Sequence, residues 1–191
     1  MSVPAAASGQ VALLLDSASL QRTMTRLAHE IGERHPSMSS VVFAGVRTRG
    51  TPMARRLAAI LGELGFASPA VVEIDARAYR DDSPRPRPVF STALHDEEGT
   101  SVDVDGAILV VVDDVLFTGR TVRAALDAIM DAGRPAAVEV LVLIDRGHRE
   151  LPVRATYVGK NVPTAAAERV SVRLREVDGV DGAWLLRGMG A

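Results

Sequence analysis

The stretch of the sequence best suited to chemistry is a pair of aspartates that follows an apolar run. Asp113 and Asp114 come directly after residues 108–112, and a Thr-Gly-Arg-Thr turn at 118–121 leads from them into a predicted helix. Ligands of open parallel sheets bind beyond the carboxyl ends of the strands, and the unpaired N–H groups at a helix start suit a phosphate. Carboxylates would repel a phosphate alone, so we expect them to meet sugar hydroxyls or a divalent cation. The segment therefore predicts a site for a ribose 5-phosphate.

A simpler interpretation of the aspartates is an acidic helix entry, in which they only offset the helix dipole. The order of an apolar run, two acids and then a Thr-Gly turn is poorly explained by that interpretation. We therefore favour the ligand site.

A second candidate loop is rich in arginine. Residues 46–50 read Val-Arg-Thr-Arg-Gly and follow an apolar run at 41–45. The two arginines suit a diphosphate, and the glycines on both sides permit a close backbone approach. The alternative is a solvated basic turn before a helix that Thr51 caps and Pro52 begins. The nearby acidic pair favours the diphosphate.

Apolar patterning places both loops on an α/β sheet. Apolar runs predict strands at 11–15, 41–45, 71–74, 108–112 and 138–144, with shorter ones near 155–158, 170–174 and 184–186. Helical periodicity predicts helices from Asp16 or Ser17 to about Arg34, over 52–64, and over 121–132 before Gly133. This alternation predicts a parallel sheet covered by helices on both faces, with 108–112 as a central strand.

Composition sets the broad class. The chain has 191 residues, of which 47% are hydrophobic, and this fits one globular domain. Its net charge of −2 excludes a uniformly basic protein that coats nucleic acid, but it does not exclude a local basic patch. Without cysteine there is no disulfide or thiolate nucleophile. No apolar run reaches the roughly 18–20 residues of a membrane span, and the first ten residues lack signal-peptide character. We expect a cytoplasmic protein.

The chain divides into a short leader and one domain. Residues 1–14 are predicted to be a flexible N-terminal segment and residues 15–191 a single domain. Within it, residues 81–100 hold Pro84, Pro86 and Pro88 and lack apolar periodicity. So long an irregular stretch predicts a functional flap, which we place at about 76–105.

Several blocks of the sequence resemble those of a known protein family. Residues 109–121 resemble the phosphoribosyl-pyrophosphate (PRPP) signature of the type I phosphoribosyltransferases. Blocks at 45–50, 79–82 and 145–152, the last continuing to 157–163, narrow the resemblance to the bifunctional pyrimidine-operon attenuation regulators and uracil phosphoribosyltransferases. The resemblance extends from about residue 15 to residue 186. It implies the fold of that family, with a small hood, a mobile flap and a non-proline cis peptide in the pyrophosphate loop.

The resemblance also implies what the protein does. Uracil and PRPP would give UMP and pyrophosphate with Mg²⁺, and UMP-dependent binding of a leader mRNA stem-loop would control transcription of pyrimidine genes. A homodimer or higher homo-oligomer is expected. The rivals are a salvage transferase without an RNA role, for uracil or even a purine, and an RNA regulator with little catalysis.

Roles carry over from the family residue by residue. Asp113, Asp114 and, from the flap, Arg80 are the implied catalytic residues, and the two aspartates would also hold Mg²⁺ indirectly. PRPP or UMP would be bound by Val46, Arg47, Thr48, Arg49, Gly50, Asp113, Asp114, Val115, Leu116, Phe117, Thr118, Gly119, Arg120 and Thr121. Uracil would lie near Arg146, Val158 and Lys160.

The implied RNA surface is basic. Arg22, Thr25, Arg26 and His29 share one face of the first predicted helix. Such a face is usually just solvated, but the match to the family favours RNA. The implied contacts are Thr25, Arg26, His29, Arg34, His148, Arg149, Arg154 and Lys160.

Overall fold

The computed structural model describes residues 10–76, 94–96 and 98–187. Residues 1–9, the Tyr79–Asp82 block with Arg80, and most of the predicted flap lie outside the described residues. A short antiparallel pair, β4 (Leu94–His95) with β5 (Ser101–Val102), belongs to the described part of that region.

The central element is a five-stranded parallel sheet in the order β3-β2-β6-β7-β8. Its strands are β2 (Val41–Val46), β3 (Ala70–Ile74), β6 (Ile108–Leu116), β7 (Ala137–Asp145) and β8 (Tyr157–Asn161). The predicted central strand is confirmed, because β6 lies in the middle of the sheet. It runs on to Leu116, so Asp113 and Asp114 lie within the end of the strand rather than after it.

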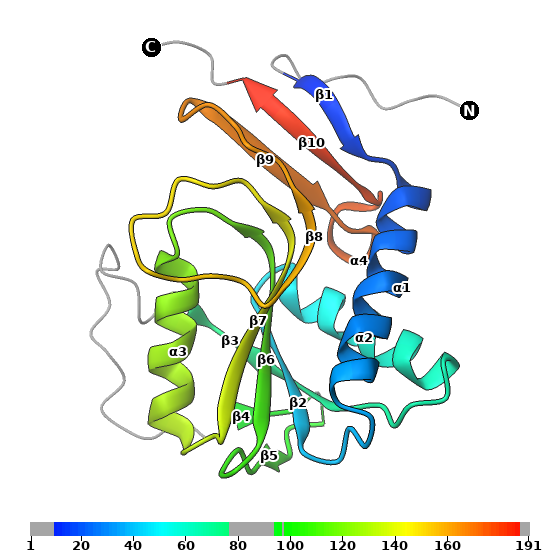
Figure 1. The fold of residues 1–191 in the computed structure, drawn as a ribbon, viewed down its shortest axis with the longest axis vertical. Helices are drawn as coiled ribbons and strands as arrows, with labels where there is room; N and C mark the ends of the chain where they lie inside the picture. Colours follow the sequence, from blue (N-terminus) through cyan, green and yellow to red (C-terminus); the bar gives the residue numbers. More distant parts are fainter. Residues whose placement is uncertain (1–9, 77–93, 97, 188–191) are drawn as a thin grey trace.

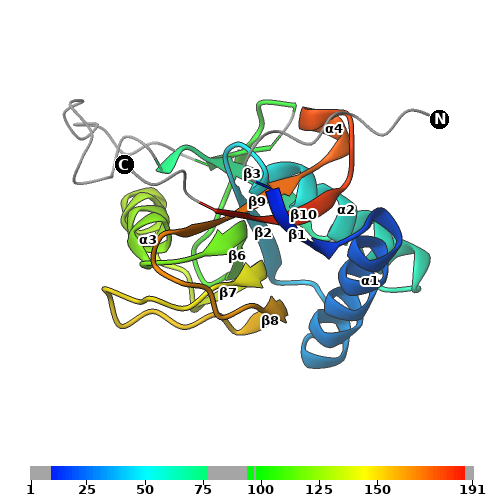
Figure 2. The same ribbon diagram turned by 90° about the horizontal axis from the view of Figure 1, so that it is seen from above.

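Helices cover both faces of the sheet, as predicted. Figures 1 and 2 show α1 (Ser17–Arg34) and α2 (Gly50–Glu63) on one side and α3 (Arg120–Ala132) on the other. Val110 of β6 packs in the core under α1 and α2, and Val111 packs in the core under α3. Both side chains are fully buried, which explains the continuous apolar run. Among the described helices, none combines the length and apolar character needed to cross a membrane.

The two predicted helix caps had different outcomes. Asp16 caps α1, since its carboxylate accepts a hydrogen bond from the Ser19 N–H at 2.7 Å. The prediction that Thr51 caps the next helix is wrong, because α2 already begins at Gly50 after Arg49. The Thr51 side chain is buried instead, with its hydroxyl 3.1 Å from the Gly45 carbonyl oxygen and 3.2 Å from Glu73 Oε2.

A second, antiparallel sheet forms a hood above the carboxyl ends of the main strands (Figure 1). It contains β1 (Gln10–Leu15), β10 (Gly182–Arg187) and β9 (Glu168–Arg173) in that order, and the short α4 (Arg175–Asp178) joins β9 to β10. The boundary drawn between residues 14 and 15 therefore crosses β1. Residues 10–14, expected to be flexible, pair with β10.

Candidate functional site

The acidic pair and the arginine loop meet at the same edge of the sheet. Strands β2 and β6 are parallel neighbours, with Gly45 opposite Val112, so the segments that follow them emerge side by side. Between them lies a cavity of about 270 Å³. It is lined by Val46, Arg47, Thr48, Arg49, Ala76, Asp113, Asp114, Val115 and Thr121.

The two aspartates lie in an environment that disfavours negative charge. Asp113 is only 8% exposed, and its Oδ1 accepts a hydrogen bond from the Asp114 N–H at 2.9 Å. Burial, and after it the charge of Asp114, raises the pKa of Asp113 well above its usual value. Burial also raises the pKa of Asp114, against the opposing charge of Arg49. A pair of this kind is best satisfied by hydroxyl donors or a cation.

The arginine loop packs directly on β6. Its Arg47–Thr48 peptide bond is cis, as the resemblance implied. Gly50 lies so close to the sheet that a Cβ atom there would be 2.1 Å from the Val112 carbonyl oxygen, and one on Gly45 would be 2.4 Å from the Thr51 Cα. The glycines that flank the loop are therefore required by close packing, which sets the loop against the acidic pair.

Both arginines of the loop are held by carboxylates. The Arg47 guanidinium contacts Glu73 Oε1 at 2.5 Å and Asp75 Oδ2 at 3.4 Å. Arg49 pairs with Asp178 of α4, at 2.7 Å from Nη2 to Oδ1 and 3.1 Å from Nε to Oδ2. The sequence predictions missed these three acids. Glu73 and Asp75 bracket the end of a predicted strand and could have been found there, whereas nothing local marks Asp178.

The Thr-Gly turn has the backbone that was expected. Gly119 has a φ of 91°, and α3 begins at Arg120 without a side-chain cap. Thr121 faces the cavity of the acidic pair. The Arg120 Nε donates to Glu150 Oε2 at 2.8 Å. The turn thus offers the start of a helix to a ligand that also touches the aspartates.

The three residues expected near uracil are spread over two regions. Arg146 is buried beside the turn, with its Cζ 4.0 Å from the centroid of the Phe117 ring and its Nε donating to Thr164 Oγ1 at 3.0 Å. Val158 lies on β8, and the Lys160 ammonium donates to the Leu14 carbonyl of the hood at 2.9 Å. None of the three lines the cavity of the acidic pair.

The eight residues expected to contact RNA also fall into two groups. The first runs along α1 and the adjoining edge of β8, where Arg26 donates to the carbonyls of Val158 and Gly159 at 3.1 and 2.7 Å. It comprises Thr25, Arg26, His29, Arg34 and Lys160. The second group, His148, Arg149 and Arg154, lies on the connection between β7 and β8.

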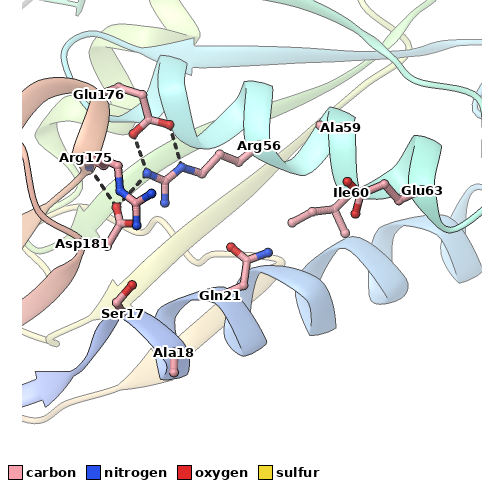
Figure 3. Close-up of a pocket in the computed structure, with 10 residues that line it drawn as sticks. All are labelled: Ser17, Ala18, Gln21, Arg56, Ala59, Ile60, Glu63, Arg175, Glu176 and Asp181. Carbon is pink, nitrogen blue, oxygen red and sulfur yellow. Dashed lines mark hydrogen bonds and ion pairs between the residues drawn. The ribbon is translucent and has the colours of Figure 1, made fainter.

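A larger cavity, of about 720 Å³, lies between α1, α2 and α4 (Figure 3). The Arg56 guanidinium at one end donates to Glu176 Oε1 and to Asp181 Oδ1, each at 2.7 Å. Arg56 and Asp181 are mostly buried, and the network ties α2 to the hood. Because these charges already satisfy one another, we assign the network a structural role and place the candidate site at the smaller cavity.

Comparison with known proteins gives one consistent picture. Residues 12–174 match the phosphoribosyl transferase domain family. The sequence is 52% identical over 179 residues to the bifunctional protein PyrR of Chloroflexus aurantiacus, covering 92% of this chain and 94% of that one. It is 47% identical to PyrR of Bacillus pumilus over 88% of this chain and 93% of that one.

Solved structures share the fold at low sequence identity. The hypoxanthine phosphoribosyltransferase of Trypanosoma cruzi superposes with a TM-score of 0.65 at 16% identity, over 94% of this chain and 98% of that one. The same enzyme in complex with the product IMP gives 0.66 at 15% identity, over 96% and 94%. The likeness confirms the predicted fold class: a parallel sheet flanked by helices, with a small hood.

Proposed function

The chain belongs to the phosphoribosyl transferase domain family and, within it, to the bifunctional PyrR proteins, and from that premise we propose how its site works. It is a uracil phosphoribosyltransferase and a regulator that binds the leader mRNA of pyrimidine genes in response to UMP. The observation that carries this function is the cavity at which the buried aspartates, the arginine loop and the end of the Thr-Gly turn meet, in a chain about half identical to its relatives. A regulator of nascent transcripts works in the cytoplasm.

In this proposal each part of the cavity takes one part of PRPP. Asp113 and Asp114 bind the ribose hydroxyls, and residues 115–121 bind the 5-phosphate through the turn and the start of α3. Val46, Thr48 and Gly50 offer backbone groups, and Arg47 and Arg49 offer charge, to the diphosphate. Arg80, which lies outside the described residues, completes the diphosphate site from the flap at about 76–105.

The residues also fit Mg²⁺. Asp113 and Asp114 would hold this ion indirectly, through oxygen ligands that they orient, and their burial leaves them in need of a positive partner. When bound with the diphosphate, the ion would neutralise charge on the leaving group.

The transfer itself is a substitution at C1 of the ribose. A bond forms from uracil N1 to C1, the C1–O bond to the diphosphate breaks, pyrophosphate leaves with the electron pair, and the N1 proton is released to solvent or to the pyrophosphate. The chain contributes by positioning and by charge stabilisation. Arg146, Val158 and Lys160 form the uracil side of the site in this proposal.

RNA binding uses the two basic groups described above, and in the second group the exposed His148 and Arg154 make the contacts. Exposed arginine and lysine side chains meet phosphates, while Thr25, His29 and His148 can reach bases or 2′-hydroxyls. A homodimer or higher oligomer would enlarge this surface.

The transferase is tested by PRPP-dependent conversion of uracil and of hypoxanthine. We expect turnover of uracil, and loss of at least a hundredfold in kcat for Asp114→Asn, the order of loss seen when a preorganised stabilising group is removed. The charge control is Glu63→Gln, on the larger cavity. Hypoxanthine turnover in place of uracil, or full activity of an Asp113→Asn, Asp114→Asn double variant, would refute the assignment.

RNA binding is tested separately, with the native pyrimidine leader. We expect UMP to tighten binding and salt to weaken it, and Arg154→Gln to lower the salt slope by about one unit. Arg187→Gln on the hood is the matched control. No binding of the leader by the unaltered protein would leave a salvage transferase without an RNA role, and binding that does not respond to UMP would overturn the UMP-dependent regulation.

A further inference from the structure

The turn at 118–121, which we propose binds the phosphate, is covered by the segment that follows β7. We call residues 146–154 the covering loop. The Glu150 and Leu151 N–H groups donate to the Thr118 carbonyl at 3.0 and 3.1 Å, and the Arg146 N–H donates to the Leu116 carbonyl at 3.1 Å. A Cβ atom on Gly119 would lie 3.3 Å from the Val153 Cβ. The turn and the covering loop therefore have little room to move independently.

The Arg149 side chain stabilises the contact between the turn and the covering loop. Its guanidinium donates to the carbonyls of Phe117 at 2.7 Å, Gly147 at 3.0 Å and Val153 at 3.2 Å, and it forms an ion pair with Asp145 at the end of β7. The side chain is 22% exposed. The fork of N–H donors on one arginine thus joins the turn, the end of β7 and both halves of the covering loop.

The part of the covering loop under Arg149 has an unusual backbone. Gly147 has a φ of 78° and His148 one of 59°. A left-handed conformation is uncommon for a residue with a side chain, and it persists where the surroundings hold it. Asp145 Oδ1 accepts from the Gly147 N–H at 3.0 Å, and the His148 ring nitrogen Nε2 is 2.6 Å from the Thr164 carbonyl oxygen. This backbone depends on the contacts around Arg149.

The same loop carries two exposed polar side chains. His148 and Arg154 are exposed there, on either side of Arg149 in the sequence. Both belong to the RNA surface of the proposed function. One short loop therefore carries both the proposed RNA contacts and the side chain that braces the turn at 118–121, and the His148 ring lies edge-on to the ring of Phe117, which precedes that turn, with 5.9 Å between the ring centroids.

We propose that Arg149 is a positioning residue that couples the 5′-phosphate of UMP to RNA binding. A phosphate bound at 118–121 fixes the positions of the Leu116–Thr118 carbonyls. Arg149 and the amides of the covering loop bind these carbonyls, so the covering loop becomes fixed as well. The side chains of His148 and Arg154 are then held in position to bind RNA. This inference rests on the proposed function. Because coupling between two binding sites is reciprocal, RNA raises the affinity for UMP by the same factor.

The test compares leader RNA affinity at saturating UMP, at saturating uridine and without nucleotide. Uridine lacks the phosphate, so in the unaltered protein we expect UMP to tighten RNA binding about 5- to 150-fold, the usual range of such coupling, and uridine to do far less. In Arg149→Gln the UMP effect should fall to near onefold. Arg149→Lys should fail likewise, since its ammonium keeps the charge but not the fork.

Arg154→Gln is the matched control. It should weaken RNA binding to a similar extent with and without UMP, so its UMP effect should stay as in the unaltered protein. An Arg149 role that was merely structural, or a direct RNA contact, would give this same pattern. An unchanged UMP effect in Arg149→Gln, or rescue by Arg149→Lys, would therefore overturn the inference and leave the proposed function standing. Absence of any UMP effect in the unaltered protein would overturn both.

A second measurement needs no variant. Hydrogen exchange of the Glu150 and Leu151 amides, which donate to Thr118, should be slower with UMP than with uridine when each is saturating. Equal exchange rates with the two ligands would overturn the inference even if the Arg149 variants failed to fold.

Discussion

Arg49 of the arginine loop at 46–50 and Asp178 of α4 form a two-point ion pair, at 2.7 and 3.1 Å. The hydrogen bonds from Arg49 lower the pKa of Asp178, and those to Asp178 raise the pKa of Arg49. Asp178 Oδ2 also accepts from the Leu174 N–H at 2.9 Å. The pair therefore links the loop after β2 to the connection between the hood strands.

The first prediction concerns this pair. In Asp178→Asn the guanidinium of Arg49 loses a charged partner, and charge-assisted hydrogen bonds of this kind contribute on the order of 1.5–3 kcal/mol. Arg49 should then lose its fixed position, and steady-state kinetics should show KM for PRPP rising by about tenfold, a change of ~1.4 kcal/mol. Glu176→Gln, which alters the neighbouring Arg56 network, is the control. A lower KM would mean that Asp178 competes with the diphosphate instead of positioning Arg49.

The second prediction contrasts two glycines of α2. A Cβ atom on Gly50 would lie 2.1 Å from a backbone oxygen of β6, whereas one on Gly62 would meet only the Ser68 Oγ, at 2.9 Å. Gly50→Ala should therefore cost ~3 kcal/mol or more of unfolding free energy, as overpacking against backbone does at the severe end, and should displace the loop. Gly62→Ala should be neutral or stabilising by up to ~1 kcal/mol, since alanine favours helix. Denaturant unfolding measures both, and equal effects of the two substitutions would contradict the packing argument.

Most of the fold could be predicted because its signals are local. The run 108–112 is apolar on both faces since β6 is covered by α1 and α2 on one side and α3 on the other. The cap at Asp16 needed only its own turn. The prediction for Thr51 was wrong because a threonine before a proline is also the usual pattern of a helix cap. The burial of Thr51 against Gly45 and Glu73 depends on a distant strand, which the local pattern does not show.

The candidate site divides in the same way. Asp113, Asp114 and the turn after them are close in sequence, so their arrangement could be predicted. The partners of the arginines could not, because Asp178 comes from an element of four residues that has no periodicity of its own. Arg149 shows a further limit. Its sequence block predicts a basic surface residue, while its guanidinium is folded back onto carbonyls from two segments.

The third prediction concerns the stack of Arg146 on Phe117, with 4.0 Å between the guanidinium carbon and the ring centroid. Phe117→Leu keeps an apolar side chain but removes the ring face, an interaction of ~0.5–2 kcal/mol. Arg146 should then be less well fixed, and KM for uracil should rise by about 3- to 30-fold, matching that energy. Met130→Leu, an exposed apolar change on α3, is the control. An effect on PRPP larger than that on uracil would contradict a role on the uracil side.

A polar cluster far from the cavity supports the fourth prediction. The buried Glu139 carboxylate of β7 accepts from the Tyr157 hydroxyl at 2.6 Å, lies 3.0 Å from His35 Nε2 and pairs with Arg34 Nε at 2.8 Å. Burial raises the pKa of Glu139, but the hydrogen bonds from Tyr157 and His35 and the nearby positive charges outweigh it, so that pKa is lowered. The cluster ties the end of α1 to the starts of β7 and β8.

Glu139→Gln should cost about 1.5–3 kcal/mol of unfolding free energy at neutral pH, the usual contribution of hydrogen bonds to a charged group, because the ion-pair partner Arg34 is itself 57% exposed. The pH dependence follows from the sign of the shift. A carboxyl whose pKa is lower in the folded than in the unfolded state contributes stability above the unfolded value, here 4.5, and loses it as the pH falls through the folded value. The difference between the unaltered protein and the variant should therefore be constant near neutrality and shrink below pH 4.5. The control is Glu33→Gln, at an exposed position of α1, which should show no such difference. If the stability difference between the unaltered protein and Glu139→Gln stayed constant down to the lowest pH at which the protein is folded, the charge of Glu139 would contribute nothing.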